Sequence, residues 1–70
     1  MSEILAQLGQ LAPWMRGAAS TLDICVGVMR RTPGVFTEAD AQRLADLVLE
    51  LRAAAARTEQ AVARVRLARH

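Results

Sequence analysis

The chain has 70 residues and a net charge of +2, from nine arginines, seven acidic residues and no lysine. Its single cysteine, Cys25, and single histidine, His70, exclude an intramolecular disulfide and a structural zinc site of cysteine and histidine. A chain of this size buries only about 60% of the surface that its unfolded state exposes, so oligomerisation is the remaining means of stabilisation.

The composition is typical of a small helical protein. Hydrophobic residues make up 53% of the chain, and fourteen residues are alanine, which favours helices that pack closely through small side chains. The start of the chain lacks the basic segment of a signal peptide, and no apolar run approaches the roughly 18 residues that span a membrane. We expect a single domain over residues 1–70, located in the cytoplasm and without membrane contact.

A first helix is predicted over about residues 3–31. Its apolar residues recur at alternating spacings of four and three, which is the pattern of a helix-packing seam. The predicted seam consists of Ile4, Leu8, Leu11, Met15, Ala18, Leu22, Cys25 and Met29. Pro13 lies inside this helix and removes the N–H that would bond the carbonyl of Gly9, so we expect a kink near Pro13.

A loop over residues 32–37 and a second helix over about residues 38–68 follow. Pro33 and Gly34 suit the two central positions of a type II turn. Thr37 is a candidate N-cap, with Asp40 three residues later in the manner of a capping box. The second helix repeats the apolar spacing through Ala41, Leu44, Val48, Leu51, Ala55, Thr58, Val62 and Val65.

Two helices of matched length joined by a short loop form an antiparallel hairpin, which makes the predicted fold class all-α. One neighbouring helix cannot cover all of the additional apolar residues Leu5, Val26, Val28 and Leu47. We expect two copies to pair around a two-fold axis into a four-helix bundle. The alternatives are a purely intramolecular core and direct docking on a different protein.

The sequence offers little for catalysis. It has no serine–histidine pair, glycine-rich phosphate loop or metal-ligand spacing, so we expect no enzyme activity, cofactor or metal site. Asp46 and Glu50 share a helix face, which favours an ordinary solvated surface over half of a carboxylate metal site. Cys25 is interpreted as a small buried hydrophobe, with a reactive thiol as the alternative.

Five residues are candidate contacts to a partner: Trp14, Arg16, Arg30, Arg57 and Arg64. Tryptophan and arginine are enriched at binding hot spots, although packing of Trp14 in the core across a dimer is the favoured interpretation of that residue. The arginines near the end of the second helix complement its dipole, and otherwise form a patch for an acidic protein surface. Phosphate binding is less favoured, because no aromatic residues or lysines lie among the arginines.

In size, two-helix design and the connection Thr32-Pro33-Gly34, the chain from Ile4 to Val65 resembles small phage-encoded inhibitors of host proteins. These include anti-activators that capture quorum-sensing transcription factors or pilus-assembly ATPases. The resemblance implies a homodimer in the host cytoplasm that binds and inhibits a regulatory protein. The architecture is also similar to that of a plasmid copy-number regulator that binds paired RNA loops, which implies the alternative of nucleic-acid binding through the C-terminal arginines.

Overall fold

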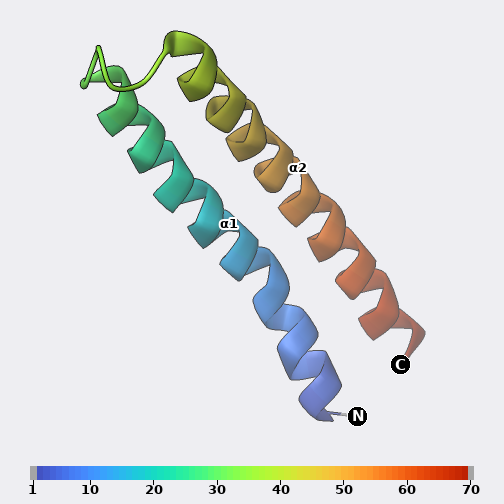
Figure 1. Cartoon of the computed structure of the whole chain (residues 1–70). Coiled ribbons are helices and arrows are strands. Elements are labelled where there is room, and N and C mark those ends of the chain that lie inside the picture. Colours follow the sequence, from blue (N-terminus) through green and yellow to red (C-terminus); the bar gives the residue numbers. More distant parts are fainter. Residues whose placement is uncertain (1, 70) are drawn as a thin grey trace.

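The computed structural model describes residues 2–69, so Met1 and the expectations placed on His70 lie outside it. It contains two helices, α1 (Ser2–Arg30) and α2 (Glu38–Ala68), which run antiparallel along each other. The loop lies at one end of the molecule and both chain ends lie at the other (Figure 1). The prediction of an all-α helical hairpin is confirmed.

Helix α1 continues through Pro13 as one uninterrupted element, and a kink at that residue stays a prediction. Near this position the side chain of Arg66 crosses from α2, and its Nη2 donates a hydrogen bond to the carbonyl of Leu5 at 3.3 Å. The same nitrogen lies 2.5 Å from the place where a Cβ on Gly9 would stand. Gly9 therefore leaves space for a guanidinium that ties the two helices together near the chain ends.

The loop has the turn and cap that the sequence predicts. The N–H of Val35 donates to the carbonyl of Thr32 at 3.4 Å, and Gly34 adopts the positive φ of 93° that a type II turn requires. Thr37 then caps α2, because its hydroxyl accepts from the N–H of Asp40 at 3.1 Å. The carboxylate of Asp40 accepts from the N–H of Thr37 in return, at 3.4 Å, which completes a capping box.

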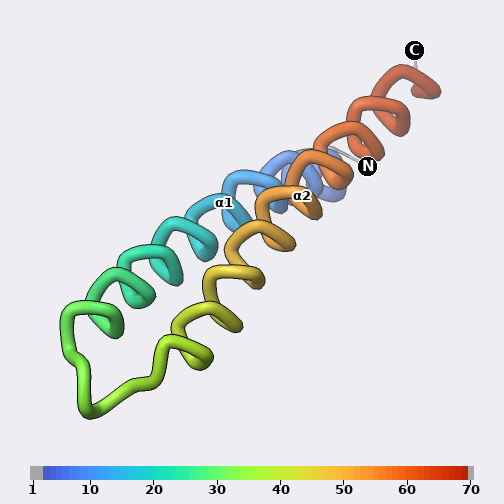
Figure 2. The backbone as a smooth tube through the Cα atoms, turned by 90° about the horizontal axis from the view of Figure 1, so that it is seen from above, coloured from blue at the N-terminus to red at the C-terminus, as the bar shows by residue number. Residues whose placement is uncertain are grey.

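The hairpin is a single layer of helices with a narrow buried strip. Its Cα extents are 55 × 17 × 10 Å, and its radius of gyration is 16.2 Å. A compact domain of this length has a radius of gyration of about 11 Å. Seen from above, the two helices cross at a shallow angle (Figure 2). Neither described helix has an apolar stretch long enough to cross a membrane.

Only small side chains are fully enclosed between the helices. The buried residues of the described chain are Ala12, Ala19, Val26, Ala41, Val48 and Ala55. The larger apolar residues next to them are only half-buried; these are Leu8, Met15, Leu22, Met29, Leu44 and Leu51. The hairpin thus leaves much of its large apolar side-chain surface in contact with solvent.

Candidate functional site

The contact row of α2 agrees with its predicted seam, whereas the contact row of α1 agrees with its predicted seam only in part. In α2, the buried and half-buried residues follow the predicted spacing from Ala41 to Val62, and Val65 is exposed. In α1, the row that enters the contact is Leu5, Ala12, Ala19 and Val26. The predicted row of Ile4, Leu11, Ala18 and Cys25 lies one residue earlier, so it is turned about 100° away and is exposed.

One side of the hairpin carries ion pairs between the helices, and we call it the paired flank. Arg16 meets Glu59 through two hydrogen bonds of 2.8 and 3.2 Å, and Arg52 Nη2 lies 3.8 Å from Asp23 Oδ2. Near the loop, Arg30 binds Glu38 at 3.0 Å. The paired flank consists of Arg16, Asp23, Arg30, Glu38, Arg52 and Glu59.

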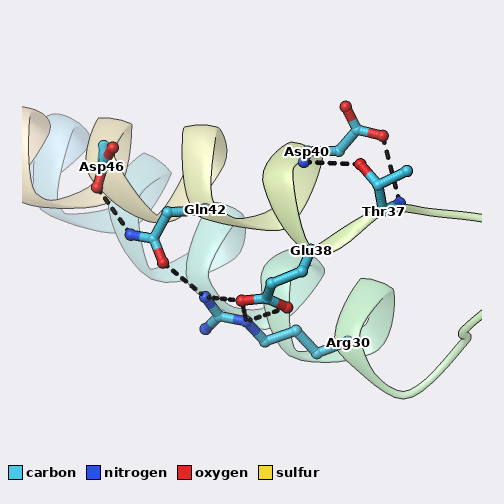
Figure 3. A network of polar contacts seen from close by, with 6 residues as sticks. All are labelled: Arg30, Thr37, Glu38, Asp40, Gln42 and Asp46. Atoms are coloured by element: carbon cyan, nitrogen blue, oxygen red, sulfur yellow. Dashed lines mark hydrogen bonds and ion pairs between the residues drawn. The ribbon is translucent and has the colours of Figure 1, made fainter.

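A polar network extends the paired flank at the loop end (Figure 3). Besides Glu38, Arg30 also donates from Nη2 to the side-chain oxygen of Gln42 at 3.2 Å. Gln42 in turn donates to Asp46 at 2.9 Å. Asp46, considered as half of a metal site, thus serves as a hydrogen-bond acceptor on a helix surface.

The charges of the paired flank shift one another in the expected directions. The guanidinium of Arg16 lowers the pKa of Glu59 through its hydrogen bonds and its charge, and Glu59 raises the pKa of Arg16. Both side chains are largely in solvent, so these shifts reflect a surface pair and contribute modestly to stability.

The opposite side of the hairpin is apolar, and we call it the apolar face. On α1, the apolar face contains the residues that directly precede the contact row, namely Ile4, Leu11, Ala18 and Cys25. It also contains Trp14 and Val28, which lie on the next row away from the contact. Its α2 members are Leu47, Ala54, Ala61 and Ala68. Trp14 is 63% exposed and Leu47 is 44% exposed. No charged residue belongs to the face as defined.

The apolar face has two shallow hollows and a charged rim along α2. One hollow, of about 270 Å³, is lined by Ile4, Leu8, Leu11 and Trp14. The other, of about 370 Å³, is lined by Leu47, Leu51, Ala54 and the rim residues Glu50 and Arg57. Arg43, Glu50, Arg57 and Arg64 follow one another at seven-residue spacing along this edge of α2, so we call them the α2 rim.

The structure divides the five candidate partner contacts into two groups. Arg16 and Arg30 belong to the paired flank and are engaged within the chain. Trp14 lies on the apolar face, while Arg57 and Arg64 stand on the α2 rim across from it. Cys25 is exposed on the apolar face and is not enclosed within the hairpin. Among residues 2–69, no three His, Cys, Asp or Glu side chains gather closely enough to hold a metal ion.

The sequence reasoning missed the paired flank, although the sequence carries a signal for it. Charged residues recur every seven positions at Arg16, Asp23 and Arg30, and the matching row of α2 carries Arg52 and Glu59. Rows of opposite charge at the spacing of a seam indicate which side of each helix faces the other. No family model, no curated protein and no solved structure matches this chain.

Proposed function

We propose that this chain is a non-enzymatic interaction protein, a helical hairpin that pairs with a second copy into a four-helix bundle and binds another protein. The observation that carries the proposal is the division of the hairpin into two unlike sides. The paired flank satisfies its charges within the chain, whereas the apolar face leaves Ile4, Trp14 and Leu47 in solvent. Apolar surface of this extent on a small chain is typical of an interface.

Energetic considerations support pairing. The residues fully enclosed in the hairpin are four alanines and two valines, which gain little from burial compared with leucine or methionine. The leucines and methionines next to them reach full burial only when a further layer covers them. A chain of this length without a disulfide needs such a layer for stability.

The partner that we propose beyond the second copy is a regulatory protein, whose surface the dimer occupies and whose activity it thereby inhibits. Size and architecture, through the resemblance to transcription-activator and pilus-ATPase inhibitors, support this choice. Val35 and Phe36 in the loop and Leu49 on the outer side of α2 are exposed apolar residues outside the apolar face. They remain accessible when the apolar face is covered.

The arginine distribution disfavours the alternative of nucleic-acid binding. Arg66 donates to a backbone carbonyl of α1 and Arg52 faces Asp23, whereas Arg57 and Arg64 stand on the other side of α2. The C-terminal arginines are thus divided between two sides of the helix, and they do not form one stripe along a nucleic-acid backbone.

Sedimentation velocity over a wide concentration range tests the pairing, and we expect the mass of two chains at micromolar concentration. A stable monomer throughout would overturn it. Affinity capture from a host lysate with mass spectrometry tests the second partner, with an Arg57→Glu, Arg64→Glu bait beside the wild type. Recovery of one protein by both baits would place its contact away from the α2 rim. Failure of every protein to enrich over an empty resin would contradict the binding function.

A further inference from the structure

We propose that the second copy lies with its α1 against α2 of the first, around a two-fold axis parallel to the length of the hairpin. Both loops are then at the same end of the bundle, and Trp14 of each copy packs against Arg57 of the other. The inference rests on the proposed pairing and specifies its geometry. Four observations carry it: the unlike sides of the hairpin, the helix register, the side-chain sizes on the apolar face and the charges on its rims.

The unlike sides decide which surface the second copy covers. In a bundle whose neighbouring helices are all antiparallel, each helix contacts one neighbour on each side of its core residues. The contact between α1 and α2 of one chain already uses the paired flank, through Arg16–Glu59 and Asp23–Arg52. The apolar face is on the other side of the core residues, where the second neighbour of each helix must lie.

The two-fold axis fixes the register between the copies. Rotation about an axis parallel to the helices leaves every residue at its own height, so residues that are level within one chain are also level between chains. Within the chain, Arg16 is level with Glu59 and Met15 with Thr58, whose hydroxyl lies 3.6 Å from the methionine sulfur. The same register pairs the apolar-face residues as Ile4 with Ala68, Leu11 with Ala61, Ala18 with Ala54, and Cys25 with Leu47.

These pairs match large side chains with small ones. Ile4 and Leu11 on α1 meet alanines on α2 of the second copy, and Leu47 meets the smaller Cys25. Alternation of large and small residues across a contact lets two helices interdigitate without voids. Because symmetry sets the register, this match needs no sliding of one copy along the other.

The charges at the edges of the proposed contact are compatible with this arrangement. The α2 rim is charged, at Arg43, Glu50, Arg57 and Arg64, and the facing edge of α1 carries the uncharged residues Gln7, Trp14, Thr21 and Val28. No like charges meet in this arrangement. Trp14 is level with Arg57 of the second copy. The small side chains of Ala54 and Ala61 next to Arg57 leave space for the indole. An arginine over an indole is a favourable cation–π contact.

The other two-fold arrangement, with an axis across the helices, places α1 on α1 and α2 on α2. In the register that sets Arg43 of one copy opposite Arg64 of the other, which is repulsive, Glu50 also lies opposite Arg57, which is attractive, so the charges of the α2 rim do not decide between the arrangements. In that register Leu47 of one α2 lies opposite Ala61 of the other, and Ala54 lies opposite its own copy. What distinguishes the first arrangement is the contact between Trp14 and Arg57, which the arrangement with an axis across the helices does not form.

Cross-linking of single-cysteine chains distinguishes the two arrangements. In a Cys25→Ser background, Ala18→Cys and Ala54→Cys chains of different tag length are mixed, unfolded, refolded together and treated with a short bis-maleimide. Ala18 is exposed and Ala54 half-buried in the hairpin, and circular dichroism checks that the helices persist. We expect cross-links between the two unlike chains, and few between like chains.

A control chain carries Gln60→Cys on the outer side of α2 and should give no product with the Ala18→Cys chain. Predominant Ala18→Cys or Ala54→Cys homodimers would overturn the inference, as would the absence of cross-links in a preparation that sediments as a dimer. A monomeric wild type would instead remove the proposed pairing itself. The two failures are therefore distinguishable.

A second test uses Trp14, the only tryptophan of the chain, as a reporter. Two Trp14–Arg57 contacts per dimer predict that Arg57→Ala raises the dimer dissociation constant about tenfold and shifts Trp14 emission to longer wavelength. Arg64→Ala is the matched control, because it faces Gln7, and should leave both quantities near the wild-type values. Equal effects of the two substitutions would contradict the contact between Trp14 and Arg57.

Discussion

The paired flank and the apolar face border the same buried strip of small residues, but one carries ion pairs and the other carries exposed apolar side chains. On the paired flank, Arg16 and Arg52 reach across to acidic residues of the other helix, and solvent can remain. On the apolar face, leucines and methionines are left half-buried beside exposed Ile4 and Leu47. The difference teaches that a hairpin can specify its internal contact with surface charges while it leaves its large apolar side chains only partly covered.

The largest expected effect comes from a charge placed on the apolar face. Leu11→Glu puts a carboxylate in the proposed interface twice per dimer and removes two leucines from it, so we expect the dimer dissociation constant to rise at least about 100-fold. Sedimentation equilibrium measures this constant. Ile24→Glu is the matched control, since Ile24 is 68% exposed and belongs to neither side. If both substitutions raised the dissociation constant equally, the apolar face would not be the dimer interface.

A smaller effect is expected from adjacent alanines that belong to different surfaces. Ala19 is fully buried between the helices, so Ala19→Leu should overpack the contact and destabilise the protein by about 1–3 kcal/mol. Ala18 is exposed on the apolar face, and Ala18→Leu should leave the hairpin contact unchanged and alter only association. Urea unfolding at several protein concentrations separates the two effects. If both variants behaved alike, the assignment of the two rows would be wrong.

The N-terminal cap of α2 lies outside both the paired flank and the apolar face, so a substitution there should change stability without changing association. Thr37→Ala removes the hydroxyl that accepts from the Asp40 N–H, which should lower the free energy of unfolding by about 1 kcal/mol without changing the oligomeric state. Thr37→Ser, which keeps a hydroxyl at the cap, should retain most of the stability. Thermal unfolding followed by circular dichroism is sufficient for this measurement.

The smallest expected effect is a pH dependence carried by the paired flank. Arg16 lowers the folded-state pKa of Glu59 below its unfolded value, so the stabilisation is present above the unfolded pKa and is lost as pH falls through the folded pKa. Glu59→Gln should therefore narrow the difference in melting temperature between pH 7 and pH 3. High salt should narrow it in the wild type as well. An unchanged pH profile in the variant would contradict the role of this pair.

The sequence predicts the hairpin because each local signal agrees with the others. The apolar spacing, the turn at Pro33 and Gly34, and the cap of Thr37 on Asp40 all point to the same two helices, and the structure contains the turn and the cap as expected. In α2, the row beside the contact row is mostly alanine, at Ala54, Ala61 and Ala68, so the spacing of the larger apolar residues identifies the contact row.

In α1 the spacing is ambiguous, because the apolar stripe is three rows wide. Rows that begin at Ile4, Leu5 and Leu8 all repeat every seven residues, and a periodicity of apolar residues cannot tell which of them faces α2. The charges at Arg16 and Asp23 resolve the choice once their α2 counterparts are considered. The predicted seam consequently combined residues of the hairpin contact, such as Met15, with residues of the apolar face, such as Leu11.

The thickness of the hairpin, 10 Å in its smallest extent, has a consequence for how the protein persists at different abundances. If a second layer supplies much of the burial, folding and association are coupled, and the folded fraction depends on chain concentration. Dilute chains would open often and be degraded, whereas abundant chains would protect one another. We expect amide hydrogen exchange in the middle of both helices to slow as protein concentration rises, while exchange at the helix ends remains fast. The lifetime of the protein would then depend on its own concentration.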